Sequence, residues 1–377
     1  MFGIYIHIPF CKKACHYCDF HFSTSLKYLD EMVDAICLEI ALKANRVQGQ
    51  AGSIYFGGGT PSILPPAALG KLFGTIEQHF SVAAEAEITL EANPDDLDAA
   101  TIKMLRTLPV NRFSIGVQSF FDEDLRWMNR AHHAAEATDS IKRSQDAGFE
   151  NLSIDLIYGY PLLSDEKWQR NLKTAIDLQV PHLSSYSLTV EPRTALWAAI
   201  EKRKEPAPTD TQSARQFAAL MTTLGQAGFE HYEISNFARP GAYAVHNTNY
   251  WRGIPYLGIG PSAHGFDGYI RYMNVANNAL YMRDLVGGKL PEQQEMLTQN
   301  DRYNEYVMTS LRTMWGLDLD KVDTDFGYLY KSHLERALKD FAGKGWLIED
   351  NRRLKLTTDG KMFADHIASE LFKVDED

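Results

Sequence analysis

The chain has 377 residues, a net charge of −11, and the 45% hydrophobic and 23% charged residues of an ordinary globular protein. Its acidity argues against a nucleic-acid binder, which usually presents a basic face. No run of about 18 apolar residues predicts a membrane span, and the N-terminus lacks the basic start and cleavage site of a signal peptide. Three of the four cysteines are clustered. We therefore expect no disulfide framework, but a cytoplasmic protein whose thiolates hold a metal.

Short strands alternate with helical segments along the first half of the chain. Runs rich in β-branched and aromatic residues predict strands at 3–8, 53–59, 87–94, 112–120, 151–161 and 182–192. Apolar residues at helical spacing predict helices at 26–46, 65–80, 98–107, 134–147 and 165–179. Because parallel strands need crossover connections, this alternation predicts an α/β fold with a parallel sheet and helices on one side. Polar residues gather at the carboxyl ends of the strands, the edge where such folds build their sites.

The chain changes character twice after the last of these strands. Residues 231–294 are rich in Gly, Tyr and Asn and predict short strands at most. Residues 295–377 become helical, with a strand pair around "DNR" (350–352), and this helix–hairpin–helix order is typical of a winged helix. We expect a core domain over 1–230, an extension over 231–294, and a C-terminal domain over 295–377 that packs against the core rather than binding DNA.

The stretch "CKKACHYC" places Cys11, Cys15 and Cys18 in a loop directly after the first predicted strand. Cubane iron–sulfur clusters usually have four thiolate ligands. Three ligands leave one iron with an open coordination position, which can bind an amine and a carboxylate. The spacing resembles that of the radical S-adenosylmethionine (SAM) superfamily. This resemblance implies a 4Fe–4S cluster held by the three cysteines, with the open iron chelating the methionine end of SAM.

Two other interpretations of the cysteines remain open. A zinc site could use the three together with His16 or His21, although zinc sites more often use paired C-x2-C elements. Cys37 lies on the apolar face of the predicted helix 26–46. Packed cysteines behave as small hydrophobic residues. We therefore expect Cys37 to be a core residue rather than a fourth ligand.

The second predicted strand ends in three glycines, within "YFGGGTPS" (55–62). Glycine lets a backbone approach a ligand closely, and we expect the N–H groups of this turn to be free for one. Four polar residues stand at or near the ends of the next strands: Glu91, Gln118, Arg130 and Asp155. Each alone is typical of a strand end or a turn. Together they suit a ribose diol, a methionine carboxylate and an adenine.

The motifs "IYIHIPFC", "YFGGGTPS", "LEANP", "GVQSF" and "DLIYGYP" resemble those of the HemN/HemW family, the oxygen-independent coproporphyrinogen III dehydrogenases and their relatives. The resemblance covers roughly residues 2–275. It implies a partial (β/α)6 TIM-like radical SAM barrel with a C-terminal helical, winged-helix-like domain. It also implies that the following residues contact SAM: Tyr5, Tyr17, Gly58, Gly59, Thr60, Glu91, Gln118, Arg130 and Asp155.

Two features separate this chain from the dehydrogenases of that family. The dehydrogenases carry a fourth cysteine two residues after the third, where this chain has Phe20. The heme chaperone branch instead has "C-D-F" and a motif H-N-x-x-Y-W, which "HNTNYW" (246–251) matches. The resemblance implies heme binding by His246, Asn247, Tyr250 and Trp251. A neutral imidazole is a common heme ligand, and Tyr and Trp offer flat apolar area for a porphyrin.

These observations leave three functions to separate. The first is a heme chaperone that binds the cluster, SAM and heme and hands heme to respiratory proteins at the inner face of the membrane. Its acidity favours specific docking there over adhesion to anionic lipid. The second is oxidative decarboxylation of coproporphyrinogen III, which Phe20 puts in doubt. The third is a zinc-binding structural protein on a barrel scaffold. For the motif itself, the alternative to heme binding is that His246 is a structural loop histidine while Tyr250 and Trp251 cover the bottom of the barrel.

Overall fold

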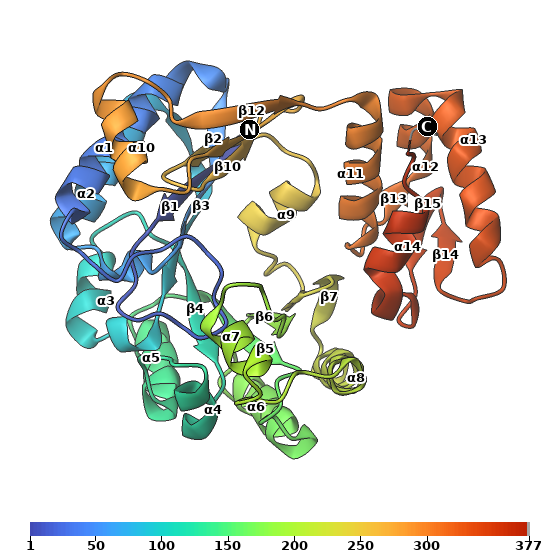
Figure 1. The fold of residues 1–377 in the computed structure, drawn as a ribbon, viewed down its shortest axis with the longest axis horizontal. Helices are drawn as coiled ribbons and strands as arrows, with labels where there is room; N and C mark the ends of the chain where they lie inside the picture. The colour runs from blue at the N-terminus through green and yellow to red at the C-terminus, as the bar shows by residue number, and fades with distance from the viewer. Residues whose placement is uncertain (375–377) are drawn as a thin grey trace.

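The structure is a computed structural model that describes residues 1–374. Its centre is a row of parallel strands, each hydrogen-bonded to the next in sequence order (Figure 1). These strands are β1 (Phe2–Ile8), β2 (Gln50–Gly58), β3 (Ser81–Ala92), β4 (Arg112–Gln118), β5 (Asn151–Tyr158) and β6 (His182–Ser187). Each overlaps a strand predicted from the sequence, and the parallel α/β prediction is confirmed.

Helices follow these strands and cover the outer face of the sheet (Figure 1). They are α1 (Leu29–Lys43), α2 (Pro66–His79), α3 (Ala99–Leu105), α4 (Asp122–Trp127), α5 (Ala134–Asp146), α6 (Asp165–Asp177), α7 (Ala195–Glu201) and α8 (Asp210–Gln226). In α1 the buried residues Met32, Val33, Ile36 and Ile40 recur at helical spacing. One face of the helix therefore packs on the sheet while the other meets solvent.

The sheet curves but does not close on itself. On one side β6 pairs antiparallel with β8 (Asn236–Ala238), which pairs with β7 (Glu230–Glu233). On the other side β1 pairs parallel with β9 (Tyr256–Ile259). The strands β10 (His264–Phe266), β11 (Ile270–Asn274) and β12 (Glu292–Met296) continue outward from β9. Because β6 and β1 do not pair, the barrel is partial, as the family resemblance implied.

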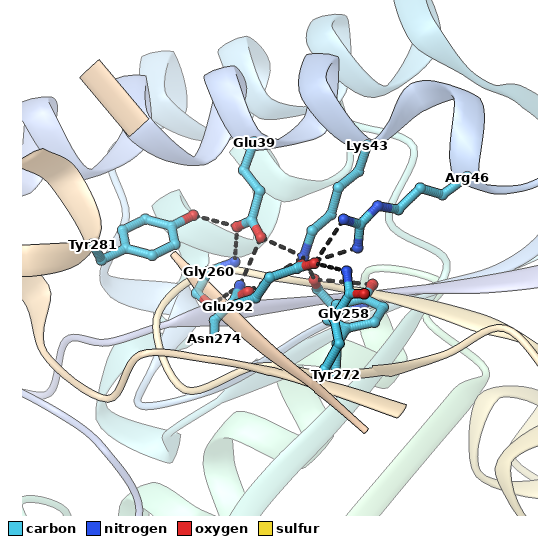
Figure 2. Close-up of polar contacts among 10 residues, drawn as sticks. Glu39, Lys43, Arg46, Gly258, Gly260, Tyr272, Asn274, Tyr281 and Glu292 are labelled. Carbon is cyan, nitrogen blue, oxygen red and sulfur yellow. Dashed lines mark hydrogen bonds and ion pairs between the residues drawn. The ribbon is translucent and has the colours of Figure 1, made fainter. Parts of the chain in front are cut away.

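A buried cluster of charges ties this extension to α1 (Figure 2). The Lys43 Nζ atom lies 2.6 Å from Glu39 Oε1 and 3.1 Å from Glu292 Oε2, and it also lies over the Tyr272 ring. The Arg46 guanidinium donates to both Glu292 oxygens, at 2.9 and 2.6 Å. Buried charges are tolerated only when they are paired and hydrogen-bonded. The pairing in this cluster therefore fixes β11 and β12 against the first helix.

The same cluster holds the turn that follows β9 beside β1. Glu39 accepts hydrogen bonds from the Gly260 N–H at 2.7 Å and from Asn274 Nδ2 at 2.6 Å (Figure 2). Gly260 has a φ of 99°, and a Cβ atom there would collide with the carbonyl of His7. Only glycine fits such a close approach in this conformation. The extension thus packs directly against the end of β1.

The C-terminal residues form a separate small core (Figure 1). The helices α9 (Val245–Trp251) and α10 (Asn278–Val286) precede this core in the chain. The core is formed by α11 (Gln299–Leu311), β13 (Leu317–Asp318), α12 (Leu319–Lys321), α13 (Tyr328–Ala337), β14 (Leu347–Asp350), β15 (Arg353–Leu356) and α14 (Ala364–Glu370). Asn351 and Arg352 join β14 to β15 with φ values of 51° and 62°. Two left-handed residues are the signature of a tight type I′ hairpin.

This C-terminal domain is bonded to the sheet through Arg312. Its guanidinium lies 3.1 Å from Glu233 Oε1 on β7, and its carbonyl accepts a hydrogen bond from Ile234 N at 3.0 Å. Figure 1 shows α9 in the space between the barrel strands and α11. Within residues 1–374, no helix combines the length and the apolar character that a bilayer crossing requires.

Candidate functional site

The cysteine loop is fixed to the end of β2 by backbone hydrogen bonds. The Gly59 N–H donates to the last carbonyl of β1 at 2.9 Å, and the Thr60 N–H donates to the Phe10 carbonyl at 2.7 Å. A Cβ atom at Gly59 would collide with that Phe10 carbonyl. The Gly58 N–H donates to Glu91. The expectation that these N–H groups are free for a ligand is therefore wrong, because the fold uses them to hold the loop.

The three thiols of the loop are half-buried beside two of the predicted SAM contacts. Thr60 Oγ1 lies 3.6 Å from Cys11 Sγ, and Arg130 Nη1 lies 3.4 Å from Cys15 Sγ. Burial raises the pKa of the Cys11 thiol and raises that of Cys18 to about 12. Thiolates in this loop therefore need a compensating cation, which the iron of a cluster would supply. The three cysteines offer the donor atoms of an iron–sulfur cluster, but in the described residues their side chains are not grouped as a metal site.

The histidines of the zinc alternative bond elsewhere. One ring nitrogen of His16 lies 2.8 Å from the last carbonyl of α4, and one of His21 lies 2.7 Å from Asn278 Oδ1. In the described part of the chain, no three His, Cys, Asp or Glu side chains are grouped to hold a metal ion. Cys37 packs against the main core from α1 and accepts a hydrogen bond from Thr75 at 3.3 Å. Its predicted role as a core residue is confirmed.

Two carboxylates face the barrel interior at the ends of β3 and β5. Glu91 accepts hydrogen bonds from the Tyr55 hydroxyl at 2.7 Å and from Gly58 N at 3.2 Å. Burial raises the pKa of Glu91 to about 7 and that of Asp155 to about 6. Hydroxyl groups that donate to the ionised carboxylates would stabilise the charged form. This arrangement suits recognition of a ribose diol.

Arg130 links the end of β4 to the cysteine loop. Its Nη2 donates to Asn93 Oδ1 at 2.6 Å and to the Gly116 carbonyl at 2.7 Å, while its Nε is buried with no hydrogen-bond partner. Burial opposes its charge, but the neighbouring Tyr17 and Cys15 raise its pKa. A buried, unpaired donor of a permanent cation fits the carboxylate of a ligand such as SAM.

Gln118 ends β4 in a strained conformation. Its φ is 65°, in the left-handed region that residues other than glycine rarely adopt, and its side chain is buried. Such strain persists only where the surrounding structure fixes it, and it is concentrated at functional sites. Hydrogen bonds join the predicted SAM contacts to one another and to the cysteine loop, because Glu91 bonds to Gly58 and Arg130 bonds to Cys15.

The "HNTNYW" motif forms the short helix α9, whose first turn is held by the barrel. Glu87 on β3 accepts hydrogen bonds from Val245 N and His246 N, both at 3.0 Å. These are backbone N–H groups that a helix cannot bond internally. A carboxylate at that position is also stabilised by the helix dipole. Glu87 thereby fixes where the motif enters the barrel.

The His246 side chain points into the barrel rather than toward solvent. Its Nδ1 lies 2.9 Å from Ser53 Oγ, and its ring centroid lies 5.2 Å from that of Tyr55 and 6.4 Å from that of Tyr5. Burial, with a smaller contribution from the charge of Arg112, lowers the pKa of His246 to about 4. The imidazole is therefore neutral at pH 7 and keeps a lone pair for a metal.

The aromatic residues of the motif lie on a different side from His246. Tyr250 is exposed and its ring contacts those of Trp251 and Tyr256, at 5.0 and 5.8 Å. Trp251 lines a cleft against the C-terminal domain. Asn247, which follows His246 and precedes the two aromatic residues, is half-buried. The structure therefore does not bring His246 together with Trp251. Phe20, which replaces the extra cysteine, is 68% exposed.

Comparison with known proteins shows to which family the chain belongs. The sequence profile of the radical SAM superfamily matches residues 5–175, and that of the HemN C-terminal domain matches residues 297–363. The heme chaperone HemW of Bacillus subtilis (strain 168) is 34% identical over 372 residues, which cover 97% of this chain and 98% of that protein. The chain belongs to the HemN/HemW family of radical SAM proteins.

Two further members of the HemN/HemW family extend the likeness. The heme chaperone HemW of Escherichia coli (strain K12) is 33% identical over 381 residues, covering 98% of this chain and 97% of that protein. The structure of coproporphyrinogen III oxidase (HemN) from Escherichia coli, a radical SAM enzyme, superimposes with a TM-score of 0.85 at 25% identity, covering 99% of this chain and 90% of that one. The predicted α/β fold with a C-terminal helical domain is confirmed.

Sequence reasoning in terms of HemN/HemW motifs missed the residues that hold α9. Ser53 and Glu87 lie on β2 and β3, on the same inward face as Tyr55 and Glu91 further along. A strand places every second residue on one face. Counting back two residues from Tyr55 and four from Glu91 would have identified the inward positions of Ser53 and Glu87.

Proposed function

We propose that this protein is a heme chaperone that holds a 4Fe–4S cluster, SAM and heme and delivers heme to respiratory proteins at the membrane. The observation that carries this proposal is His246: a neutral imidazole, held by Ser53, that faces the inside of the barrel. The relatives from Bacillus subtilis and Escherichia coli that are 34% and 33% identical to the chain are heme chaperones by name. Heme delivery is the function that uses both the imidazole and the barrel.

The cluster and SAM would be held by residues at the carboxyl end of the barrel. Cys11, Cys15 and Cys18 would ligate the iron, and the cluster supplies an electron to SAM when both are bound. The remaining contacts would come from Tyr5, Tyr17, Gly58, Gly59, Thr60, Glu91, Gln118, Arg130 and Asp155. Arg130 offers its unpaired Nε–H to a carboxylate, and Glu91 and Asp155 accept from ribose hydroxyls.

Heme would be bound by the α9 motif. For His246 Nε2 to carry the lone pair, Nδ1 must carry the proton and donate it to Ser53 Oγ. The Ser53 hydroxyl can accept that hydrogen bond, which leaves Nε2 free to ligate iron. Asn247 follows on the same helix. Tyr250 and Trp251 lie on a different side of α9 from His246, where their rings offer flat apolar surface for a porphyrin outside the barrel.

The alternative function is oxidative decarboxylation of coproporphyrinogen III. The full-length likeness to the HemN structure favours it. Phe20 opposes it, because it removes the thiol that the dehydrogenases carry at that position, and its ring is exposed where that thiol would be. The heme chaperone is therefore the function that the site supports best.

An assay with coproporphyrinogen III separates the two functions. The protein is reconstituted with iron and sulfide without oxygen and supplied with SAM and a reductant, and the propionate side chains of the porphyrinogen are followed. We expect no carbon dioxide release and no protoporphyrinogen, while added hemin gives a shifted Soret band that weakens in His246→Ala. Stoichiometric carbon dioxide release, or a Soret band unchanged by the substitution, would contradict the proposal.

A further inference from the structure

A cleft of about 570 Å³ lies where the end of α9 meets the C-terminal domain. Its aromatic walls are Trp251 from α9 and Trp315 and Tyr306 from the C-terminal domain, all half-buried. Sites for small molecules and cofactors commonly occupy about 300–1,000 Å³, lie between domains and are lined by aromatic surface. The cleft has the size, position and lining of a site for a flat ligand.

The charge of the cleft is opposite to that of the chain. Its charged lining consists of Arg252, Lys321, Arg353, Lys355 and a single carboxylate, Asp318. The whole chain has a net charge of −11. Cations that gather in a concave surface of an otherwise acidic protein raise the local concentration of anions. The flat ligand that fits this cleft is therefore one that carries acidic groups.

Two of these cations are available to such acids. The Arg252 guanidinium lies 4.3 Å from the centroid of the Trp315 ring, and Lys321 Nζ lies 4.6 Å from that of Tyr306. Within residues 1–374 neither forms an ion pair with a carboxylate, whereas Arg353 pairs with Asp318 and Lys355 pairs with Asp350. Arg252 and Lys321 thus place positive charge that no carboxylate neutralises over the faces of two aromatic rings in the cleft.

We propose that this cleft binds a porphyrin by its carboxylate side chains, with the macrocycle in the cleft and the carboxylates at Arg252 and Lys321. The proposal rests on the proposed heme-binding function and adds a second porphyrin site, separate from His246. His246 does not line the cleft, because its ring lies among Tyr5 and Tyr55 in the barrel. Binding in the cleft therefore needs no iron ligand, and a metal-free porphyrin binds there as well.

The test compares metal-free protoporphyrin IX with its dimethyl ester, in which both carboxylates are blocked. Affinity is measured from the quenching of tryptophan fluorescence in the full-length protein. We expect Arg252→Gln combined with Lys321→Gln to weaken protoporphyrin IX about tenfold or more, since two charge-assisted contacts are lost. The ester should bind wild type about as weakly as the free acid binds the variant.

A matched control is available in the same chain. Arg106 lies over Phe149 at 5.0 Å and Lys344 lies over Phe341 at 4.7 Å, and both are exposed cations on aromatic rings outside the cleft. Arg106→Gln combined with Lys344→Gln removes the same charges and should leave protoporphyrin IX affinity unchanged. If both double variants weakened protoporphyrin IX binding equally, the effect would be one of overall charge and the cleft proposal would be overturned.

The outcome also separates this inference from the function on which it rests. If hemin binds wild type in a manner sensitive to His246→Ala, but protoporphyrin IX binds wild type and the cleft variant equally, the cleft proposal fails and heme binding stands. Failure of protoporphyrin IX to bind wild type overturns the cleft proposal as well. If hemin also gives no shifted Soret band with wild type, heme binding fails together with it.

Discussion

Glu87 holds His246 by its backbone: one carboxylate oxygen lies 3.0 Å from the His246 N–H, and the other lies 3.0 Å from the N–H of Val245. Glu87 is buried on an inward-facing strand of the barrel, four residues before Glu91. One strand therefore carries both a residue proposed for SAM and the residue that positions the proposed heme ligand. The strand β3 thus connects the two proposed sites.

Replacing Glu87 with alanine should therefore disturb the start of α9. We expect a loss of stability of about 3–5 kcal/mol and a changed hemin spectrum, because the buried Arg112, 3.7 Å from Glu87, loses its carboxylate partner together with the capping contacts. Glu85→Ala is the control, because Glu85 is exposed on the same strand and should change stability by less than about 0.5 kcal/mol. Urea unfolding followed by tryptophan fluorescence measures both. Equal losses in the two variants would show that the capping contacts contribute nothing.

The cysteines should divide into three that hold the cluster and one that does not. Replacing Cys11, Cys15 or Cys18 with alanine should abolish the brown 4Fe–4S absorbance, because each removes one of three ligands. Cys37→Ala should retain it, since Cys37 bonds to Thr75 in the outer helical layer. Iron and sulfide content after anaerobic reconstitution provides the measurement. Loss of the cluster in Cys37→Ala alone would contradict the three-ligand assignment.

SAM affinity should depend on the two carboxylates of the barrel. Glu91→Ala and Asp155→Ala should each weaken SAM binding by roughly 1.5–3 kcal/mol while leaving iron content unchanged, because each loses hydrogen bonds from ligand hydroxyls. Isothermal titration calorimetry on the reconstituted protein measures the affinity. Unchanged SAM affinity in both variants would mean that these two carboxylates do not contact SAM and have only a structural role near the ends of their strands.

Glu91 should also make the stability of the ligand-free protein depend on pH. Its pKa is raised by burial from 4.5 to about 7 in the folded chain, so folding takes up a proton between these values and stability falls as pH rises through that range. Glu91→Gln cannot ionise. It should match wild type near pH 4.5 and exceed it by about 1–3 kcal/mol above pH 7. Thermal unfolding across this range measures the gap, and a gap that does not widen with pH would contradict the burial argument.

The barrel strands and the strand-end residues were predictable because both depend on local patterns. Strand and helix periodicities can be recognised from neighbouring residues. Cys11 follows one such strand, and Glu91 and Asp155 lie in the second halves of two others. The packing of the extension (residues 231–294) against the core could not be predicted in this way. Its attachment depends on Asn274 bonding to Glu39, a residue 235 positions earlier in the chain. No local pattern reports a contact at that separation.

Long-range contacts also determine where the side chains of the heme motif point, and the sequence alone does not show this. The sequence identifies the residue types of "HNTNYW", but it does not show that His246 faces the barrel while Trp251 faces the C-terminal domain. That division depends on Glu87, which bonds to His246 N from 159 residues away. The turn of three glycines was misjudged for a related reason. Its N–H groups are occupied by partners, such as the Phe10 carbonyl, that only the folded chain brings close.

The most direct test of the central claim is transfer of heme to a recipient. The protein is loaded with hemin and mixed with respiratory membranes from heme-starved bacteria, and reduced-minus-oxidised spectra record the cytochromes that gain heme. We expect the loaded protein to fill these cytochromes faster than an equal amount of hemin bound to serum albumin, and His246→Ala to lose this advantage. Equal rates from the protein, its variant and albumin would contradict the account of this chain as a heme chaperone.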